Sequence, residues 1–138
     1  MKRVSIFLVV VFLSVFSQKI NAQQTVTVTI ENIASEKGKI AVALFNKQNF
    51  LKMPVQGTFS AIKDGKSTAV FKNVPKGEYA IGCFHDENNN YQLERSENGM
   101  PLERYGFSNT KKLKRAPVFD DMKFSVEDED VSLSIELQ

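Results

Sequence analysis

The sequence predicts an all-β protein in which two sheets of short strands pack as a sandwich. Three observations support this fold class. Apolar and polar residues alternate with the period of a β-strand at both ends of the chain, turn-forming residues separate the alternating runs, and no segment carries the 3.6-residue pattern of a long helix. Seven short antiparallel strands in a chain of this length favour a sandwich, and a closed barrel is the alternative.

Seven segments have the composition expected of strands. Residues 25–30 alternate Thr with Val and Ile, and residues 131–137 alternate polar residues with Val, Leu and Ile. Each of these two strands should place one face on a core and the other in water. The remaining predicted strands are residues 39–46, 58–63, 67–73, 78–85 and 122–126.

The breaks between these strands contain turn-forming residues. Asp64-Gly65 between two strand-like runs is typical of a tight hairpin. Residues 36–38 and 74–77 each end in Gly and predict further turns. Residues 86–118 have almost no strand or helix pattern, but they hold too many apolar residues for a free linker. We expect this one long loop to be ordered and to fold back on the sandwich.

The N-terminus has the features of a secretory signal peptide. Two basic residues precede an apolar run of 13 residues, 4–16, and a polar stretch ends in Ala22. A membrane-spanning helix needs about 20 apolar residues. The sequence therefore predicts cleavage near Ala22, a mature domain at residues 23–138 without a membrane span, and a periplasmic or secreted location.

The mature chain would be close to neutral. The signal peptide contains three of the 18 Lys and Arg residues, which leaves 15 against 16 Asp and Glu. This balance gives no charge argument for a nucleic-acid partner. Cys83 is the only cysteine in the sequence, so it has no internal disulfide partner and is expected to be a small buried apolar residue.

A polar run after the predicted strand at residues 78–85 has the spacing of a calcium loop. Residues with side-chain or backbone oxygens fall at positions 1, 3, 5, 7, 9 and 12 of such a loop. They are Asp86, Asn88, Asn90, Gln92, Glu94 and Glu97. Position 6 is Tyr91, where the pattern requires Gly for a turn with positive φ. The alternative is a polar turn whose side chains bond their own backbone.

His85 precedes this run and allows an enzymatic alternative. A small metal-assisted hydrolase would use His85 and Asp86, and it requires His85 to be exposed in a concave pocket. A Ser-His-Asp set with Ser108 can also be written down, but nothing in the spacing supports it. As the last residue of its predicted strand, His85 is expected to anchor the start of the loop.

Three blocks of sequence carry a resemblance to a known family. They are FKNVPKGEYAIGCFHDENNN at residues 71–90, GMPLERYGFSN at 99–109 and APVFDDMKF at 116–124. Together they closely resemble an exported bacterial family catalogued as domain of unknown function 2141. That family usually has Gly where this chain has Asn89 and Tyr91, and it has no established activity to transfer.

Residues 74–79 also resemble the hairpin of transthyretin-like sandwiches, in which a Pro-x-Gly-x-Tyr segment leads into a core strand. This resemblance implies a prealbumin-like Greek key of seven strands and a binding or scaffold role. The expected protein is an exported, non-enzymatic module with a Ca²⁺ loop and a carbohydrate or envelope-protein partner. A purely structural envelope protein is the other reading. The residues expected to pin the loop or contact a ligand are His85, Tyr105, Phe107, Ser108 and Asn109.

Overall fold

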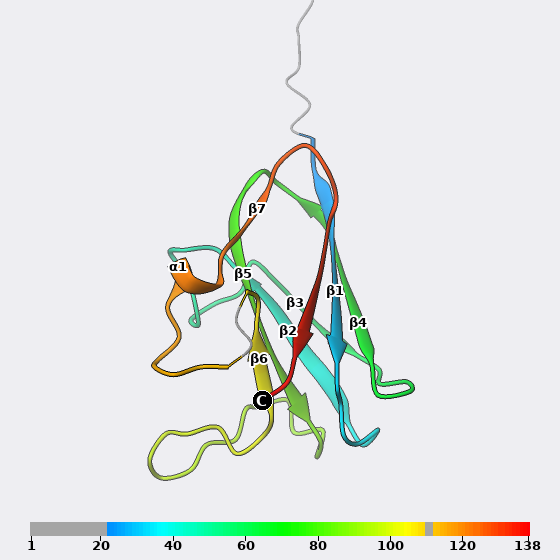
Figure 1. Ribbon diagram of the computed structural model, residues 1–138, viewed down its shortest axis with the longest axis vertical. Coiled ribbons are helices and arrows are strands. Elements are labelled where there is room, and N and C mark those ends of the chain that lie inside the picture. The colour runs from blue at the N-terminus through cyan, green and yellow to red at the C-terminus, as the bar shows by residue number, and fades with distance from the viewer. Residues whose placement is uncertain (1–21, 110–111) are drawn as a thin grey trace, which may run out of the picture.

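The computed structural model describes residues 22–109 and 112–138, and in it two β-sheets pack against each other (Figure 1). One sheet has the strand order β4-β1-β8, and the other has the order β3-β2-β5-β6, with β7 also pairing with β5. The elements are β1 (Gln24–Glu31), β2 (Lys39–Phe45), β3 (Gln56–Ser60), β4 (Ser67–Val74), β5 (Gly77–Asp86), β6 (Tyr105–Phe107), α1 (Phe119–Met122), β7 (Phe124–Val126) and β8 (Val131–Glu136). The all-β class is confirmed. The predicted signal peptide lies outside the described residues, except for Ala22.

The described residues form eight strands where the sequence predicted seven. All seven predicted strands are present, but the third lies earlier than expected, at Gln56–Ser60, and Met122, expected to begin the strand at 122–126, belongs to α1. The additional strand is β6, which has three residues and is too short to show an alternating pattern. The predicted hairpin at Asp64-Gly65 is confirmed, because both residues have positive φ and Lys63 and Lys66 pair across the turn.

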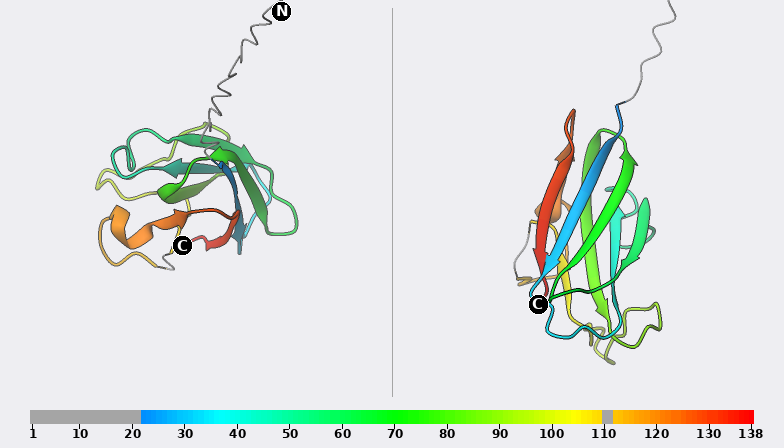
Figure 2. Two further views of the ribbon diagram at one scale, coloured as in Figure 1. Left: turned by 90° about the horizontal axis from the view of Figure 1, so that it is seen from above. Right: turned by 90° about the vertical axis from the view of Figure 1, so that its right-hand side faces the viewer.

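The main core lies between the two sheets. Val26, Val28 and Ile30 point inward from β1, and Ile40 and Leu44 point inward from β2, all with 0% exposure. Burying one such side chain contributes about 1.5–3 kcal/mol relative to leaving it in water. The right-hand view of Figure 2 shows β8, β1 and β4 as one layer over the second sheet.

The prediction that all strands are antiparallel is wrong for one pair. β8 runs parallel to β1, with Val26 opposite Val131 and Ile30 opposite Ile135. The turn after β7 takes the chain from the second sheet to the first, so β8 arrives beside β1 in the same direction. Both strands still point their apolar residues to one face, which is what the alternation requires. Alternation alone therefore does not decide strand direction.

A second, smaller cluster covers part of the outer face of the second sheet. The segment between β6 and β7 folds back so that Phe119 and Met122 of α1 pack on Ala80 and Phe107, with Phe50 and other residues around them. The ring centroids of Phe50 and Phe119 are 5.7 Å apart in an edge-to-face arrangement. No helix in the described part of the chain is long and apolar enough to cross a membrane.

Ser108 joins the two short strands at the edge of this sheet. β6 pairs with residues 82–84 of β5 and β7 with residues 77–79, so Ile81 would lack an edge partner. The backbone N–H of Ser108 donates to the Ile81 carbonyl oxygen at 3.0 Å, and the Ile81 N–H donates to Ser108 Oγ at 2.9 Å. Ser108 Oγ in turn donates to the Met122 carbonyl oxygen at 2.6 Å. Asn109 Nδ2 donates nearby to the Lys123 carbonyl oxygen.

Candidate metal site

Asp86 curls the loop that follows β5. It is the last residue of the strand, its side chain is fully buried, and both carboxylate oxygens accept backbone hydrogen bonds. Oδ1 accepts from the Asn90 N–H at 3.1 Å, and Oδ2 accepts from the Tyr91 N–H at 3.0 Å. A buried carboxylate is costly unless hydrogen bonds or a cation satisfy it. The chain therefore bends around the Asp86 side chain.

Three further predicted ligands converge in this loop. The side-chain amides of Asn88 and Asn90 both donate to Glu94 Oε1, each at 2.8 Å. Their Oδ1 atoms accept from the backbone N–H groups of Asn90 and Gln92, at 3.2 and 3.0 Å. The structure thus brings together the side chains of Asn88, Asn90 and Glu94, while Gln92 lies in the same turn and contributes its backbone.

The turn forms at the position where the sequence lacks Gly. Tyr91 itself adopts φ +63°, and Asn89 adopts φ +55°. The loop therefore bends as a calcium loop requires, although an aromatic residue is strained in this region.

Sequence reasoning missed Glu103. Its Oε2 accepts the Glu94 N–H at 3.2 Å, while its Oε1 is buried without a hydrogen-bond partner among the described residues. Burial raises the pKa of Glu103, and the negative charges of Asp86 and Glu94 raise it further, whereas the Glu94 N–H and His85 lower it. An orphaned carboxylate oxygen beside two other carboxylates is the arrangement that a bound cation would stabilise.

A small hairpin brings Glu103 beside Glu94. Arg95 pairs with Pro101, and the Leu102 N–H donates to the Glu94 carbonyl oxygen at 2.8 Å, so the chain returns beside its own beginning. Glu97 lies exposed near the tip of this hairpin. Counting ligand positions along the sequence leads to Glu97. It cannot detect a residue that the hairpin returns to the loop from further along the chain. The assignment of Glu97 as a ligand stays a prediction, and the geometry favours Glu103 in its place.

The donor set fits a hard cation better than a transition metal. Within residues 22–109 and 112–138, no three His, Cys, Asp or Glu side chains are grouped closely enough to hold a metal by themselves. A site here depends on amide and backbone oxygens as well as carboxylates, a mixture typical of calcium. To present oxygen to an ion in place of their N–H groups, Asn88 and Asn90 would each make a half-turn of the amide and exchange the bonds that their Oδ1 atoms accept from the Asn90 and Gln92 N–H groups for the ion.

His85 supports the base of the loop. Its side chain is 1% exposed, and its Nε2 lies 2.7 Å from the Lys37 carbonyl oxygen. Nδ1 lies 3.5 Å from Glu87 Oε1. The imidazole thus ties the turn between β1 and β2 to the end of β5, as an anchoring role requires.

The two aromatic rings expected to pin the loop pack on the sheet. Phe107 is 9% exposed and belongs to the outer cluster, and Tyr105 packs against that cluster partly buried. Their ring centroids are 6.1 Å apart at a steep angle. A sugar would have little access to Phe107.

Cys83 is buried in the core. Burial raises the pKa of its thiol to about 12, and the thiol donates to the Gly106 carbonyl oxygen at 3.6 Å. The thiol therefore stays protonated and is a poor nucleophile at neutral pH.

We expect a maleimide reagent at pH 8 to label Cys83 of the folded protein only as fast as the protein unfolds. In protein unfolded by urea, labelling should be immediate. Rapid labelling of the folded protein, measured by mass spectrometry, would contradict this burial.

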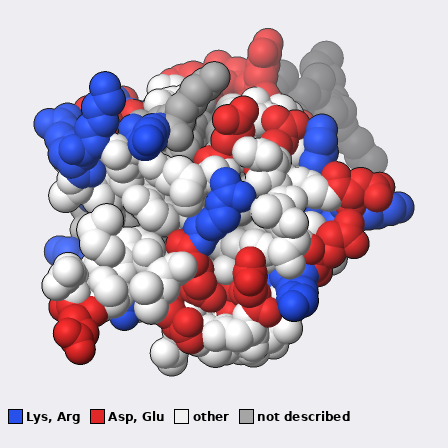
Figure 3. All heavy atoms as spheres, turned by 60° about the horizontal axis from the view of Figure 1, so that its bottom comes forward, with Lys and Arg blue, Asp and Glu red and all other residues white. Residues whose placement is uncertain are grey.

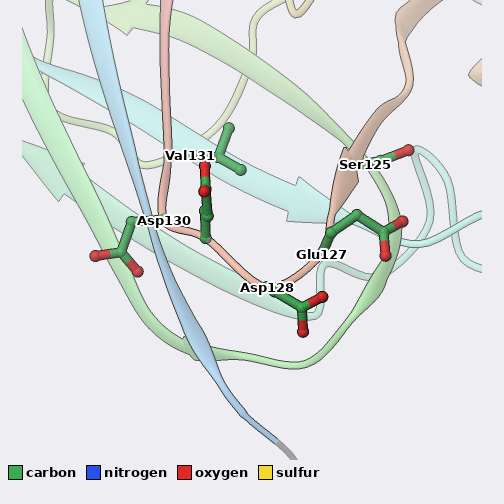
Figure 4. A pocket seen from close by; sticks show the side chains of 6 residues that line it. Ser125, Glu127, Asp128, Asp130 and Val131 are labelled. Atoms are coloured by element: carbon green, nitrogen blue, oxygen red, sulfur yellow. The ribbon is translucent and has the colours of Figure 1, made fainter.

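A hollow elsewhere on the surface does not form a comparable site. It is open and lies at the turn between β7 and β8, lined by residues 125 and 127–131. Figure 4 shows the side chains of Glu127, Asp128 and Asp130 pointing apart. Lys76 forms a salt bridge with Asp128, and Asp130 accepts the Thr25 N–H at 2.8 Å. At the end of the sandwich that carries the loop after β5, acidic and basic side chains are interspersed (Figure 3).

Comparison with known families identifies the chain at the level of its family. A family model described as "Uncharacterized protein conserved in bacteria (DUF2141)" matches residues 28–134. The chain belongs to this family. The matched DUF2141 segment includes nearly all of both sheets and the whole loop from Asp86 to Glu103. A search of curated proteins found no match.

Proposed function

We propose that this DUF2141 protein is an exported, non-enzymatic β-sandwich module whose loop after β5 binds one calcium ion. The ligands are the carboxylates of Glu94 and Glu103 and the side-chain oxygens of Asn88 and Asn90, while Asp86, whose two oxygens accept backbone N–H groups, holds the loop in shape. Calcium supplies charge neutralisation and cross-links the two ends of the loop. The observation that carries this proposal is the buried, unpartnered Oε1 of Glu103, a carboxylate whose other oxygen accepts the Glu94 N–H of the loop that bends around Asp86.

The location and the detailed topology belong to the same proposal. The leader-like N-terminus supports export to the periplasm or the medium. The prealbumin-like Greek key is supported by the turn between β4 and β5, which takes the chain from one sheet to the other and in which the Tyr79 hydroxyl donates to the Pro75 carbonyl oxygen at 2.9 Å. In this arrangement the loop is a rigid projection at one end of the sandwich, positioned to meet a carbohydrate or an envelope protein.

A non-enzymatic role is supported by the state of His85. The metal-assisted hydrolase requires His85 to face a substrate, whereas its ring is 1% exposed and bonded to the Lys37 carbonyl oxygen. A group held in this way has no free nitrogen in reach of a substrate. The hydroxyl of Ser108 is likewise engaged, between Ile81 and Met122.

Thermal unfolding in calcium tests the proposal. The processed protein, purified from an exporting host, is unfolded with millimolar calcium, with magnesium and with chelator. A ligand at about 100 times its Kd adds about 2.7 kcal/mol, which should raise Tm by about 10 °C in a domain of this size. We expect this rise with calcium, a much smaller one with magnesium, and almost none in a Glu103→Gln variant.

Glu97→Gln is the matched control, because it removes the same charge from the same loop at an exposed position. It should keep the calcium response. Loss of the response in Glu97→Gln but not in Glu103→Gln would overturn the ligand assignment while leaving calcium binding intact. Equal Tm values in calcium and chelator for the unaltered protein would refute the calcium role itself.

A further inference from the structure

Two exposed aromatic rings and a lysine meet on the outer face of the second sheet. Tyr91 of the loop is 58% exposed and Phe59 of β3 is 44% exposed, and their ring centroids are 5.0 Å apart. Lys39 Nζ lies 4.7 Å from the centroid of the Tyr91 ring and 5.7 Å from that of Phe59. It also donates to the Tyr91 hydroxyl at 3.1 Å. We call Lys39, Phe59 and Tyr91 the aromatic platform.

The backbone of Tyr91 indicates that its ring serves a purpose other than folding. Tyr91 holds φ +63°, a conformation that Gly adopts without strain and an aromatic residue does not. The contacts that the ring makes in return are at the surface, where aromatic and cation–π pairs contribute little. A strained residue whose side chain stays in solvent is a reason to look for a ligand.

Small residues lie beside the two rings on the outer face of the sheet. On the outer face, Ala41 lies opposite Phe59 and Ala43 lies opposite Gly57. The side chain of Pro54 and the Val42 carbonyl oxygen are the nearest atoms to a Cβ built on Gly57, both at an ordinary contact distance of 3.8 Å, and Gly57 itself is exposed. An extended chain of sugar rings could lie along this strip of small residues.

The charge on the platform favours an anion. Lys39 is in no salt bridge among the described residues, although six such pairs occur elsewhere in them. An ammonium group between two aromatic rings is matched by a ligand that has an apolar ring face and a carboxylate. Uronic acids, the acidic sugars, have both: the C–H groups of the sugar ring pack on an aromatic face, and the carboxylate meets the lysine.

We propose that the aromatic platform binds an acidic polysaccharide, with Tyr91 and Phe59 against a sugar ring and Lys39 opposite its carboxylate. This inference rests on the proposed function, because it names the ligand class that the loop would present.

A Tyr91→Gly variant tests the platform without harming the loop, since Gly suits the backbone at this position. Binding is measured by calorimetry with a hyaluronan hexasaccharide and a galacturonate hexamer as acidic probes. The neutral probe is an N-acetylglucosamine hexamer, and each titration is run in calcium and in chelator. We expect the unaltered protein to bind at least one acidic probe and to prefer it to the neutral one. Tyr91→Gly should weaken that binding about tenfold or more while keeping Tm and the calcium response.

Two further variants complete the test. Lys39→Gln should remove the preference for the acidic probe, while Val70→Ala, which trims an exposed apolar side chain of β4 in the other sheet, should change nothing. Failure to bind either acidic probe, or equal binding by Tyr91→Gly, would overturn the inference. Equal binding of the neutral probe with no effect of Lys39→Gln would overturn the acidic ligand class. The calcium response is measured without sugar, so failure of the calcium proposal is recognised separately.

Discussion

Gly38→Ala is expected to lower the free energy of unfolding by about 4 kcal/mol. Gly38 has φ +70°, and a Cβ at this position would lie 1.9 Å from the Asp86 carbonyl oxygen and 2.7 Å from the Glu87 Cα. The positive φ costs an L-residue about 1–2 kcal/mol, and forcing an atom into packed backbone costs about 1–3 kcal/mol more. The clash falls on the residues that begin the candidate metal site, so the calcium response should weaken as well.

Gly99→Ala separates these two causes. Gly99 has nearly the same backbone conformation, φ +77°, but a Cβ there meets nothing within 4 Å. This variant should therefore lose only the conformational part, about 1–2 kcal/mol. Urea unfolding followed by fluorescence or circular dichroism measures both losses. If Gly38→Ala were no more destabilising than Gly99→Ala, the backbone of Gly38 would not lie as close to Asp86 as described.

Ser108→Ala is expected to cost about 3 kcal/mol. The substitution leaves the Ile81 N–H and the Met122 carbonyl oxygen without the hydroxyl that each contacts, in a place that water does not reach. An unsatisfied buried polar group costs about 1–3 kcal/mol, and here there are two. The break should also separate β6 from β7 at the edge of the sheet and loosen the α1 segment that depends on this junction.

Hydrogen exchange gives this prediction a local readout. The Ile81 amide should exchange faster in Ser108→Ala than in the unaltered protein, and urea unfolding should show a lower midpoint. Ser125→Ala is the control, because Ser125 is an exposed serine of β7 and its loss should stay within about 0.5 kcal/mol. A loss of less than about 1 kcal/mol in Ser108→Ala would contradict a bridging role for its hydroxyl.

Local sequence was a reliable guide wherever one face of a strand had to be apolar. The alternation of residues 25–30 predicted β1, and burial of Val26, Val28 and Ile30 follows from it. The Asp64-Gly65 pair predicted its own turn, because both residues accept positive φ. The first part of the polar loop could also be predicted from the sequence, because the side chain of Asp86 bonds only to the nearby backbone of Asn90 and Tyr91.

Only the tertiary structure decided the features that depend on distant residues. The direction of β8 follows from the crossover between sheets, and alternation is the same for parallel and antiparallel neighbours. Glu103 reaches Glu94 because a hairpin returns the chain, which residue counting cannot detect. Ser108 looked like a loop residue, yet its hydroxyl fills a gap left between two strand ends. Strand periodicity and turn propensity can be read from residues that are close in sequence. Contacts between distant segments form only when packing brings their polar groups together.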